Sequence, residues 1–186
     1  GGLVPVLWAG GGSSAFDRAK YLELGGFEDL FRPCYVEDVS LSYQAWRRGW
    51  RCLYRSDAVT HHVRRGTSNR VFGERGVERL QRRNRELFFW RSVTDPIMML
   101  ERAFFLPWDV LKDAARTGLV AQCAALLGAV FRFPRAVMAR QRSRSRYRFS
   151  DREVLRRSCH VGLHRRAIVP VAGTDPTLLV VGAGQC

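Results

Sequence analysis

The chain has 186 residues, of which 46% are hydrophobic and 26% charged. This composition excludes wholesale disorder, collagen-like repeats and a disulfide-stabilised miniprotein, and the length suits one domain or one domain with an appendage. The 31 Lys+Arg outweigh the 17 Asp+Glu to give a net charge of +14, and only Lys20 and Lys112 are lysines. Such a positive field favours anionic partners, namely nucleotide-linked substrates, acidic lipid or nucleic acid.

The cysteines and the ends of the chain bear on its setting. No two cysteines form a C-x-x-C pair, which predicts a reduced, cytosolic protein without a zinc site or disulfide framework. The sequence shows no signal-peptide pattern and no run of 18 apolar residues. It starts with Gly-Gly-Leu-Val-Pro and stops just after an apolar run, so we expect it to be a piece of a longer protein. The five cysteines are Cys34, Cys52, Cys123, Cys159 and Cys186.

Residues 1–68 alternate short apolar runs, glycine turns and one helical pattern. An apolar run at 4–9 leads into a glycine loop, after which we predict a helix capped at Ser13 or Ser14 and ended by Gly25. Apolar spacing over 37–48 predicts a second helix that Gly49 ends. Residues 51–60 read as a strand that runs into two histidines.

The following residues are helical in pattern and rich in arginine. Residues 69–95 read as a basic helix, and 96–140 as two apolar helices broken by Pro107, Gly118 and Pro134. Seven of the 17 residues from 132 to 148 are arginine. Residues 176–184 are apolar and enter a glycine turn, which fits either the first strand of a further Rossmann-like unit or a buried tail strand. The first apolar helix places five residues on one side, Ile97, Leu100, Phe104, Trp108 and Leu111.

Two local patterns are candidates for chemistry. Gly10, Gly11 and Gly12 could let the backbone approach a ligand closely or form an ordinary strand-to-helix turn, and their spacing fits neither a Walker loop nor a dinucleotide fingerprint. Glu37 and Asp38 begin a predicted helix, where carboxylates complement the helix dipole. In the functional alternative, one of them is a general base that accepts a proton from a substrate hydroxyl.

A third candidate is the histidine pair His61-His62 at the end of the predicted strand. An imidazole in this place could bind a metal ion or a phosphate, although a histidine pair is more often plain surface. Taken together, the order of these patterns is more specific than any one of them.

In that order the chain resembles the acceptor-side half of family 2 glycosyltransferases, which have the GT-A fold. The resemblance is strong over 8–95, including an Arg-Asn-Arg helix at 83–85, and looser over 96–158. The matching segments are 9–16 (Ala-Gly-Gly-Gly-Ser-Ser-Ala-Phe), 24–27 (Leu-Gly-Gly-Phe), 35–38 (Tyr-Val-Glu-Asp), Leu41, 48–50 (Arg-Gly-Trp) and 58–62 (Ala-Val-Thr-His-His).

The resemblance implies an inverting transfer of a sugar from a nucleotide-sugar donor to an acceptor hydroxyl, on a saccharide or a lipid-linked acceptor, in cell-envelope or polysaccharide biosynthesis. Asp38 would be the base and Glu37 its support. The loop formed by Gly10, Gly11, Gly12 and Ser13 would shape the floor between donor and acceptor. His62 would lie near the metal and diphosphate, and Arg65 and Ser68, on the loop that follows, could meet phosphate.

The chain also departs from the family pattern. Ser40 stands where the family usually has a second Asp, and no Asp-x-Asp motif is present in the sequence. That motif carries the divalent cation (Mg²⁺ or Mn²⁺) in the N-terminal half of the family's fold. We therefore expect an α/β chain with a partial GT-A, Rossmann-like mixed sheet over 1–95, a basic helical extension over 96–158, and a linker with the possible start of a second domain over 159–186. Alone, this piece should be inactive.

The basic, apolar extension has two interpretations. Its helices could pack on the catalytic domain, or lie on a membrane with arginines toward anionic headgroups. A helix over 118–133 would rise about 24 Å, short of the ~30 Å hydrocarbon core, so a surface position is favoured over a span. We expect a cytoplasmic protein, with attachment to the inner face of the cell membrane as the alternative.

Two other classes of function remain open. The charge of +14 also suits a nucleic-acid-binding module, although no helix-turn-helix, zinc-finger, RRM or KH pattern is visible and no specific nucleic acid is expected. A sequence-selective complex that survives ~0.3 M salt would favour that class. A non-catalytic membrane-surface adaptor would bind liposomes and be indifferent to Asp38→Asn.

Overall fold

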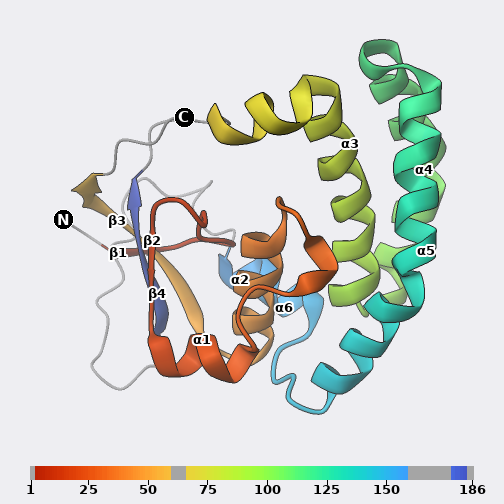
Figure 1. Cartoon of the computed structure of the whole chain (residues 1–186). Helices are drawn as coiled ribbons and strands as arrows, with labels where there is room; N and C mark the ends of the chain where they lie inside the picture. Colours follow the sequence, from red (N-terminus) through yellow and green to blue (C-terminus); the bar gives the residue numbers. More distant parts are fainter. Residues whose placement is uncertain (1–2, 60–65, 159–176, 184–186) are drawn as a thin grey trace. The chain divides into compact units, whose positions relative to one another are not determined.

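The computed structural model describes residues 3–59, 66–158 and 177–183 (Figure 1). The helices and strands alternate in the first part of the chain, and long helices follow. In chain order the elements are β1 (Leu3–Pro5), β2 (Ser14–Phe16), α1 (Arg18–Leu24), a 3-10 turn η1 (Asp29–Phe31), α2 (Glu37–Arg47), β3 (Arg51–Val59), α3 (Gly66–Ser92), α4 (Pro96–Thr117), α5 (Leu119–Arg144), α6 (Asp151–Ser158) and β4 (Thr177–Ala183).

The chain forms two compact units that each draw on separate stretches of sequence. The first unit comprises Gly1–Glu28, Glu37–Arg64 and Arg146–Cys186, and the second comprises Asp29–Val36 and Arg65–Ser145. The predicted domain boundary at residue 95 lies within the second unit, between α3 and α4.

The sheet of the first unit is mixed, with strand order β1-β3-β4-β2. β3 and β4 pair in parallel, whereas β1 pairs with β3 and β2 with β4 in antiparallel fashion. The described residues are thus α/β, as predicted, but they do not show a Rossmann fold. The last apolar run forms β4, which pairs with β3 on one side and with β2 on the other.

The first helix starts later than predicted. Ser14–Phe16 forms strand β2 against β4, so the helix begins only at Arg18, and Asp17 rather than a serine is its cap. The Asp17 carboxylate accepts the backbone N–H of Lys20 at 3.0 Å, which satisfies a donor that a helix start leaves free. The helix ends, as predicted, at Gly25, whose φ of 88° suits a residue without a Cβ.

Helix α2 is the centre of the first unit, and all of residues 40–47 are buried. Its polar side chains find partners: the Ser42 hydroxyl accepts the N–H of Ala9 at 3.1 Å, and the Trp46 indole donates to the Val6 carbonyl at 3.0 Å. Gln44 accepts the Tyr147 hydroxyl at 2.9 Å. Buried polar groups that are satisfied in this way hold the neighbouring segments in fixed places.

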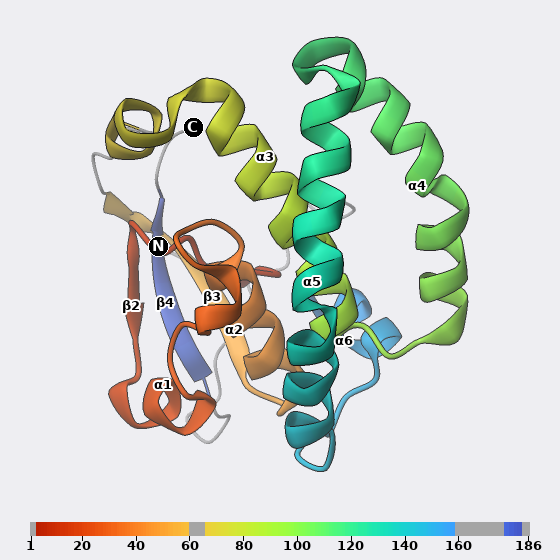
Figure 2. The same cartoon turned by 45° about the vertical axis from the view of Figure 1, so that its right-hand side comes forward.

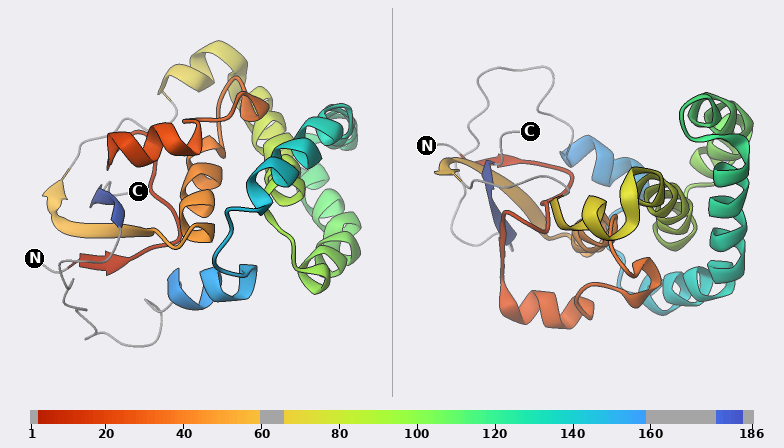
Figure 3. Two further views of the ribbon diagram at one scale, coloured as in Figure 1. Left: turned by 90° about the horizontal axis from the view of Figure 1, so that it is seen from below. Right: turned by 45° about the horizontal axis from the view of Figure 1, so that its top comes forward.

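The last helix of the first unit is bound to α2 by a buried ion pair. The Arg47 guanidinium donates to the Asp151 carboxylate, which also accepts the Tyr43 hydroxyl at 2.5 Å. Both charged side chains are almost fully buried. Figure 3 shows α6 beside α2. Removal of one partner would leave an uncompensated buried charge, so this pair fixes α6 against α2.

The second unit is built from three long helices. Figure 2 shows α5 lying along α3, with α4 returning beside α5. Helix α3 is kinked at Gly73, which has a φ of 66°. Pro107 and Pro134 lie inside α4 and α5, so their prediction as breaks is wrong. Only Gly118, with a φ of 87°, separates the two helices. A proline removes one helical hydrogen bond, which a long helix can tolerate as a local irregularity.

Three cysteines lie among the described residues. Cys34, Cys52 and Cys123 are not in disulfide bonds, and burial raises the pKa of the Cys52 thiol to about 12.

Asn84 connects α3 to the segment that precedes α2. Its side-chain amide lies within 2.7–2.9 Å of the carbonyl oxygens of Phe31, Cys34 and Tyr35, and its own oxygen accepts from Arg83 at 3.0 Å. Asn84 is fully buried. This one side chain therefore organises the loop of the second unit that leads to Glu37.

We predict that Asn84→Ala lowers the free energy of unfolding by about 3 kcal/mol, because it leaves buried carbonyls without donors. Asn84→Asp keeps the size but supplies no amide donors, and should cost as much. Denaturant unfolding measures the effect, with the exposed Asn69→Ala on the same helix as the control. Equal stability of Asn84→Ala and Asn69→Ala would contradict this role.

Candidate functional site

Asp38 lies in the first turn of α2 and contacts the glycine loop. Its Oδ2 accepts the backbone N–H of Gly11 at 3.0 Å, and its Oδ1 accepts the N–H of Val39 at 2.8 Å. The carboxylate is partly exposed, and Gly11 is exposed. The structure thus places side by side, within one unit, two predicted site residues that are separated by 27 positions in sequence.

The glycine loop is a tight turn that faces this carboxylate. The Ser13 N–H donates to the Gly10 carbonyl at 3.2 Å, and the Ser14 hydroxyl donates to the same oxygen. A Cβ at Gly11 would lie 3.7 Å from the Asp38 Cβ and 3.9 Å from its Oδ2. Neither Gly10 nor Gly11 has a positive φ. The glycine at position 11 therefore leaves open the space beside the carboxylate, and the backbone conformation does not require it.

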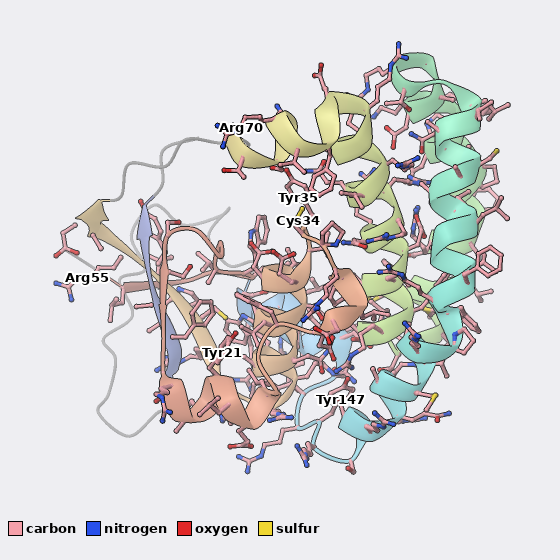
Figure 4. All side chains as sticks on the ribbon, in the orientation of Figure 1. Tyr21, Cys34, Tyr35, Arg55, Arg70 and Tyr147 are labelled. Atoms are coloured by element: carbon pink, nitrogen blue, oxygen red, sulfur yellow. The ribbon has the colours of Figure 1, made fainter. Side chains whose placement is uncertain are left out.

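An aromatic cluster borders the loop. The rings of Phe16, Tyr21 and Phe27 pack edge-on or tilted, with centroids 5.6–5.9 Å apart; Tyr21 is labelled in Figure 4. The tip of Phe27, its Cζ, lies 3.7 Å from the position of a Cβ at Gly11, and this ring is 39% exposed. We did not single out Phe27 as a site residue from sequence. Its place directly after the Gly25-Gly26 turn was the available signal.

Glu37 precedes Asp38 and is half-buried. Its Oε2 is buried and has no hydrogen-bond partner. Burial is the main cause that raises the pKa of this carboxyl, and the neighbouring charge of Asp38 raises it further. Since a buried acceptor without a donor is costly, Glu37 is suited to receive a hydrogen bond from a bound ligand.

The backbone before this pair is strained. Tyr35 and Val36 have φ values of 78° and 73°, in the left-handed region where a β-branched residue is rare. Such residues persist only where the surroundings hold them, and here Asn84 binds the Tyr35 carbonyl. No sequence pattern revealed the positive φ values of these two residues.

Ser40 has a structural contact. It is buried, and its hydroxyl donates to the Glu28 carboxylate at 3.2 Å. The contact ties α2 to the residue that follows the Gly-Gly-Phe turn.

Of the three remaining predicted site residues, His62, Arg65 and Ser68, the structure describes Ser68. His62 and Arg65 lie outside the described residues. Ser68 lies in the first turn of α3 and not on a loop, which corrects the prediction, because the helix already starts at Gly66. Its hydroxyl is 2.5 Å from that of Tyr35, so it contacts the segment that precedes the Glu37-Asp38 pair.

The described residues offer no built metal site. Among them no group of three or more His, Cys, Asp or Glu side chains is arranged to hold an ion.

A second polar cluster lies between α3 and α4 in the second unit. A cavity of about 260 Å³ is lined by arginines, phenylalanines and one acid. The buried Glu86 carboxylate forms ion pairs with Arg82, at 3.6 Å, and with Arg102. The Asp113 carboxylate forms an ion pair with Arg85 at 3.1 Å. Because these acids alternate with the arginines, the cluster is better explained as a structural ion-pair network than as an anion site. The residues that line the cavity are Arg82, Arg85, Phe88, Phe89, Arg102 and Asp109.

Comparison with known proteins reveals no relative. The chain matches no protein-family model, no curated protein and no solved structure. The interpretation of the site consequently depends on its geometry and on the resemblance of its motifs.

The raised pKa of Glu37 leads to a prediction about stability and pH. The folded state holds this proton more tightly than the unfolded chain, so ionisation above the ordinary pKa of 4.5 lowers the free energy of unfolding as the pH rises. Glu37→Gln should raise the melting temperature at pH 7 and have little effect at pH 4. The exposed Glu101→Gln is the control. A destabilised Glu37→Gln protein at pH 7 would contradict the assignment.

Proposed function

We propose that this chain is the acceptor-side half of an inverting family 2 glycosyltransferase of GT-A fold, with Asp38 as the general base. The observation that carries the proposal is the contact between Gly11 and Asp38, which puts a partly exposed carboxylate beside an open glycine loop. A general base needs such a position within reach of the hydroxyl that it deprotonates.

Asp38 keeps the capacity to accept a proton. Each of its oxygens accepts one backbone N–H, which leaves a further lone pair on each for a substrate hydroxyl. The two backbone donors also fix the carboxylate in one orientation. The base is thus held by main-chain groups, which a ligand does not have to displace.

The proposed reaction is a single displacement. The acceptor oxygen forms a bond to the anomeric carbon of the donor sugar as the bond from that carbon to the diphosphate breaks, and the acceptor proton passes to Asp38. One carboxylate suffices, since no glycosyl-enzyme intermediate is formed, unlike in retaining hydrolysis. A divalent cation would supply charge stabilisation for the leaving diphosphate, through residues that we expect outside this chain.

The neighbours of Asp38 suit an acceptor sugar. The free Oε2 of Glu37 can accept a hydrogen bond from an acceptor hydroxyl. The exposed ring of Phe27 offers an apolar surface to the C–H face of a sugar. The small residue at position 11 leaves room for both to reach the same ligand.

The contacts that several arginines make within the protein weaken the nucleic-acid alternative. Several bind protein groups within their own unit: Arg83 donates to the Arg32 carbonyl at 2.6 Å, and Arg140 donates to the Val93 carbonyl at 3.0 Å. Arg47 is buried in its pair with Asp151. These three arginines thus support the fold and do not contribute to a free phosphate-binding surface.

We predict that Asp38→Asn lowers sugar transfer by 10²- to 10⁴-fold, the usual contribution of a general base. The assay uses the full-length protein with Mn²⁺ and a panel of UDP-, GDP- and dTDP-sugars, and follows release of nucleoside diphosphate. Asp57→Asn, at an exposed carboxylate paired with Arg55, is the control. Equal turnover of Asp38→Asn and the wild type would exclude Asp38 as the base.

We also predict that Gly11→Ala separates activity from stability. The added methyl meets its neighbours at ordinary van der Waals distance and a φ outside the left-handed region, so the melting temperature should be unchanged or slightly higher. The methyl nevertheless occupies the space beside Asp38 and should displace the acceptor. Because catalysis is sensitive to the position of the substrate, we expect sugar transfer to fall about tenfold through a higher KM for the acceptor. A fully active Gly11→Ala enzyme would show that the acceptor does not bind there.

A further inference from the structure

We propose that the α4–α5 hairpin of the second unit binds the surface of an anionic lipid bilayer. The proposal does not depend on the glycosyltransferase assignment, because it concerns other residues. Its basis is the direction in which the large apolar side chains of the two helices face, together with the charge of the unit that carries them.

Helix α4 exposes the apolar stripe that its sequence predicts. The five apolar residues repeat at intervals of three and four, the spacing of one helix face, yet none of the 22 residues of α4 is buried. A soluble helix of this pattern normally packs its stripe into a core. Here Ile97, Leu100, Phe104, Trp108 and Leu111 are 51%, 70%, 78%, 67% and 62% exposed.

Helix α5 reverses the usual arrangement of small and large residues. Its buried positions are Gln122, Ala125, Ala129 and Ala136, and a Cβ at Gly128 would lie only 3.3 Å from the Arg83 side chain. Its large apolar residues face outward. Small residues at helix contacts and large apolar residues on the outside are typical of helices whose surroundings are lipid. The outward residues are Leu119, Val120, Leu127, Val130, Phe131 and Met138.

Among the described residues, most of the large apolar side chains that are exposed lie on α4 and α5. Single exposed apolar residues need no explanation, but a continuous apolar face marks an interaction site. Side chains project outward along α4 and α5 in Figure 4. Among the described residues, α5 is the one helix whose length and composition would allow it to cross a membrane, and 22% of its most apolar 18-residue stretch is buried. From the sequence we expected no membrane span.

The contacts of Arg132 favour a surface position over a span. Residues 119–131 rise about 20 Å as a helix, less than the ~30 Å hydrocarbon core. The next residue, Arg132, donates from Nη1 to the carbonyls of Leu30 and Arg32 at 2.9 and 3.1 Å. The helix is thus fixed to the loop of its own unit directly after its apolar part, as expected of an amphipathic helix that lies in the interface.

The charge of the second unit selects anionic lipid. Its two segments hold 17 Lys+Arg against 8 Asp+Glu, a net charge of +9. Arg116 at the end of α4 and Arg135, Arg142 and Arg144 on the last turns of α5 are exposed. Basic residues beside an inserted apolar face strengthen binding to acidic headgroups and lose that effect as salt screens them.

The test uses the full-length protein and flotation with two kinds of vesicle, phosphatidylcholine alone and phosphatidylcholine with 30% phosphatidylglycerol. We expect at least tenfold tighter binding to the anionic vesicles, weakened by salt. The double variant Trp108→Glu/Phe131→Glu changes only exposed side chains and should bind at least tenfold more weakly. The matched control is Val71→Glu, at an apolar residue of α3 that is 62% exposed, and it should bind like the wild type.

Three outcomes would overturn the proposal. The first is no preference of the wild type for anionic vesicles. The second is unchanged binding of the double variant. The third is that the wild type does not bind vesicles but forms a dimer, and that the double variant is a monomer. This result would assign the face to a second copy of the chain. Asp38→Asn should still bind vesicles, so a failure of the glycosyltransferase assignment remains distinguishable.

Discussion

The first unit is organised by the need to bury a helix that is rich in polar residues. Helix α2 carries Ser42, Gln44 and Arg47 on turns without access to water. Each of these groups must be paired inside the protein, because an unpaired buried polar group costs 1–3 kcal/mol. Segments before and after α2 in sequence supply the partners, and Asp151 pairs with the buried Arg47. The packing of this unit follows from those pairings.

The same constraint explains why Asp38 is suited to chemistry. The body of α2 is immobilised by its partners, while its first turn stays partly exposed and meets the glycine loop at Gly11. A rigid element positions a side chain more precisely than a loop can. The strain at Tyr35 and Val36, borne by the loop that Asn84 holds, adds to this fixed entry into the helix.

The candidate site could be predicted from sequence only in part. The pairing of a glycine loop with a Glu-Asp helix start pointed to Gly11 and Asp38, and the structure brings these two together. The pattern did not reveal Phe27 as a neighbour, nor the unpaired oxygen of Glu37. Both depend on packing between segments distant in sequence. Ser68, predicted on a loop, lies in a helix because α3 already begins at Gly66.

The sequence by itself determined the elements whose limits are local. Helix α2 and the ends at Gly25 and Gly118 follow from apolar periodicity and from the conformations that glycine alone adopts readily. Tertiary structure decided the rest. Pairing with β4 made a strand of Ser14–Phe16, long helices continued through their prolines, and the packing of α5 on α3 through small residues turned the large apolar side chains outward. These features depend on the energies of contacts between segments that are distant in sequence, and local sequence patterns do not contain that information.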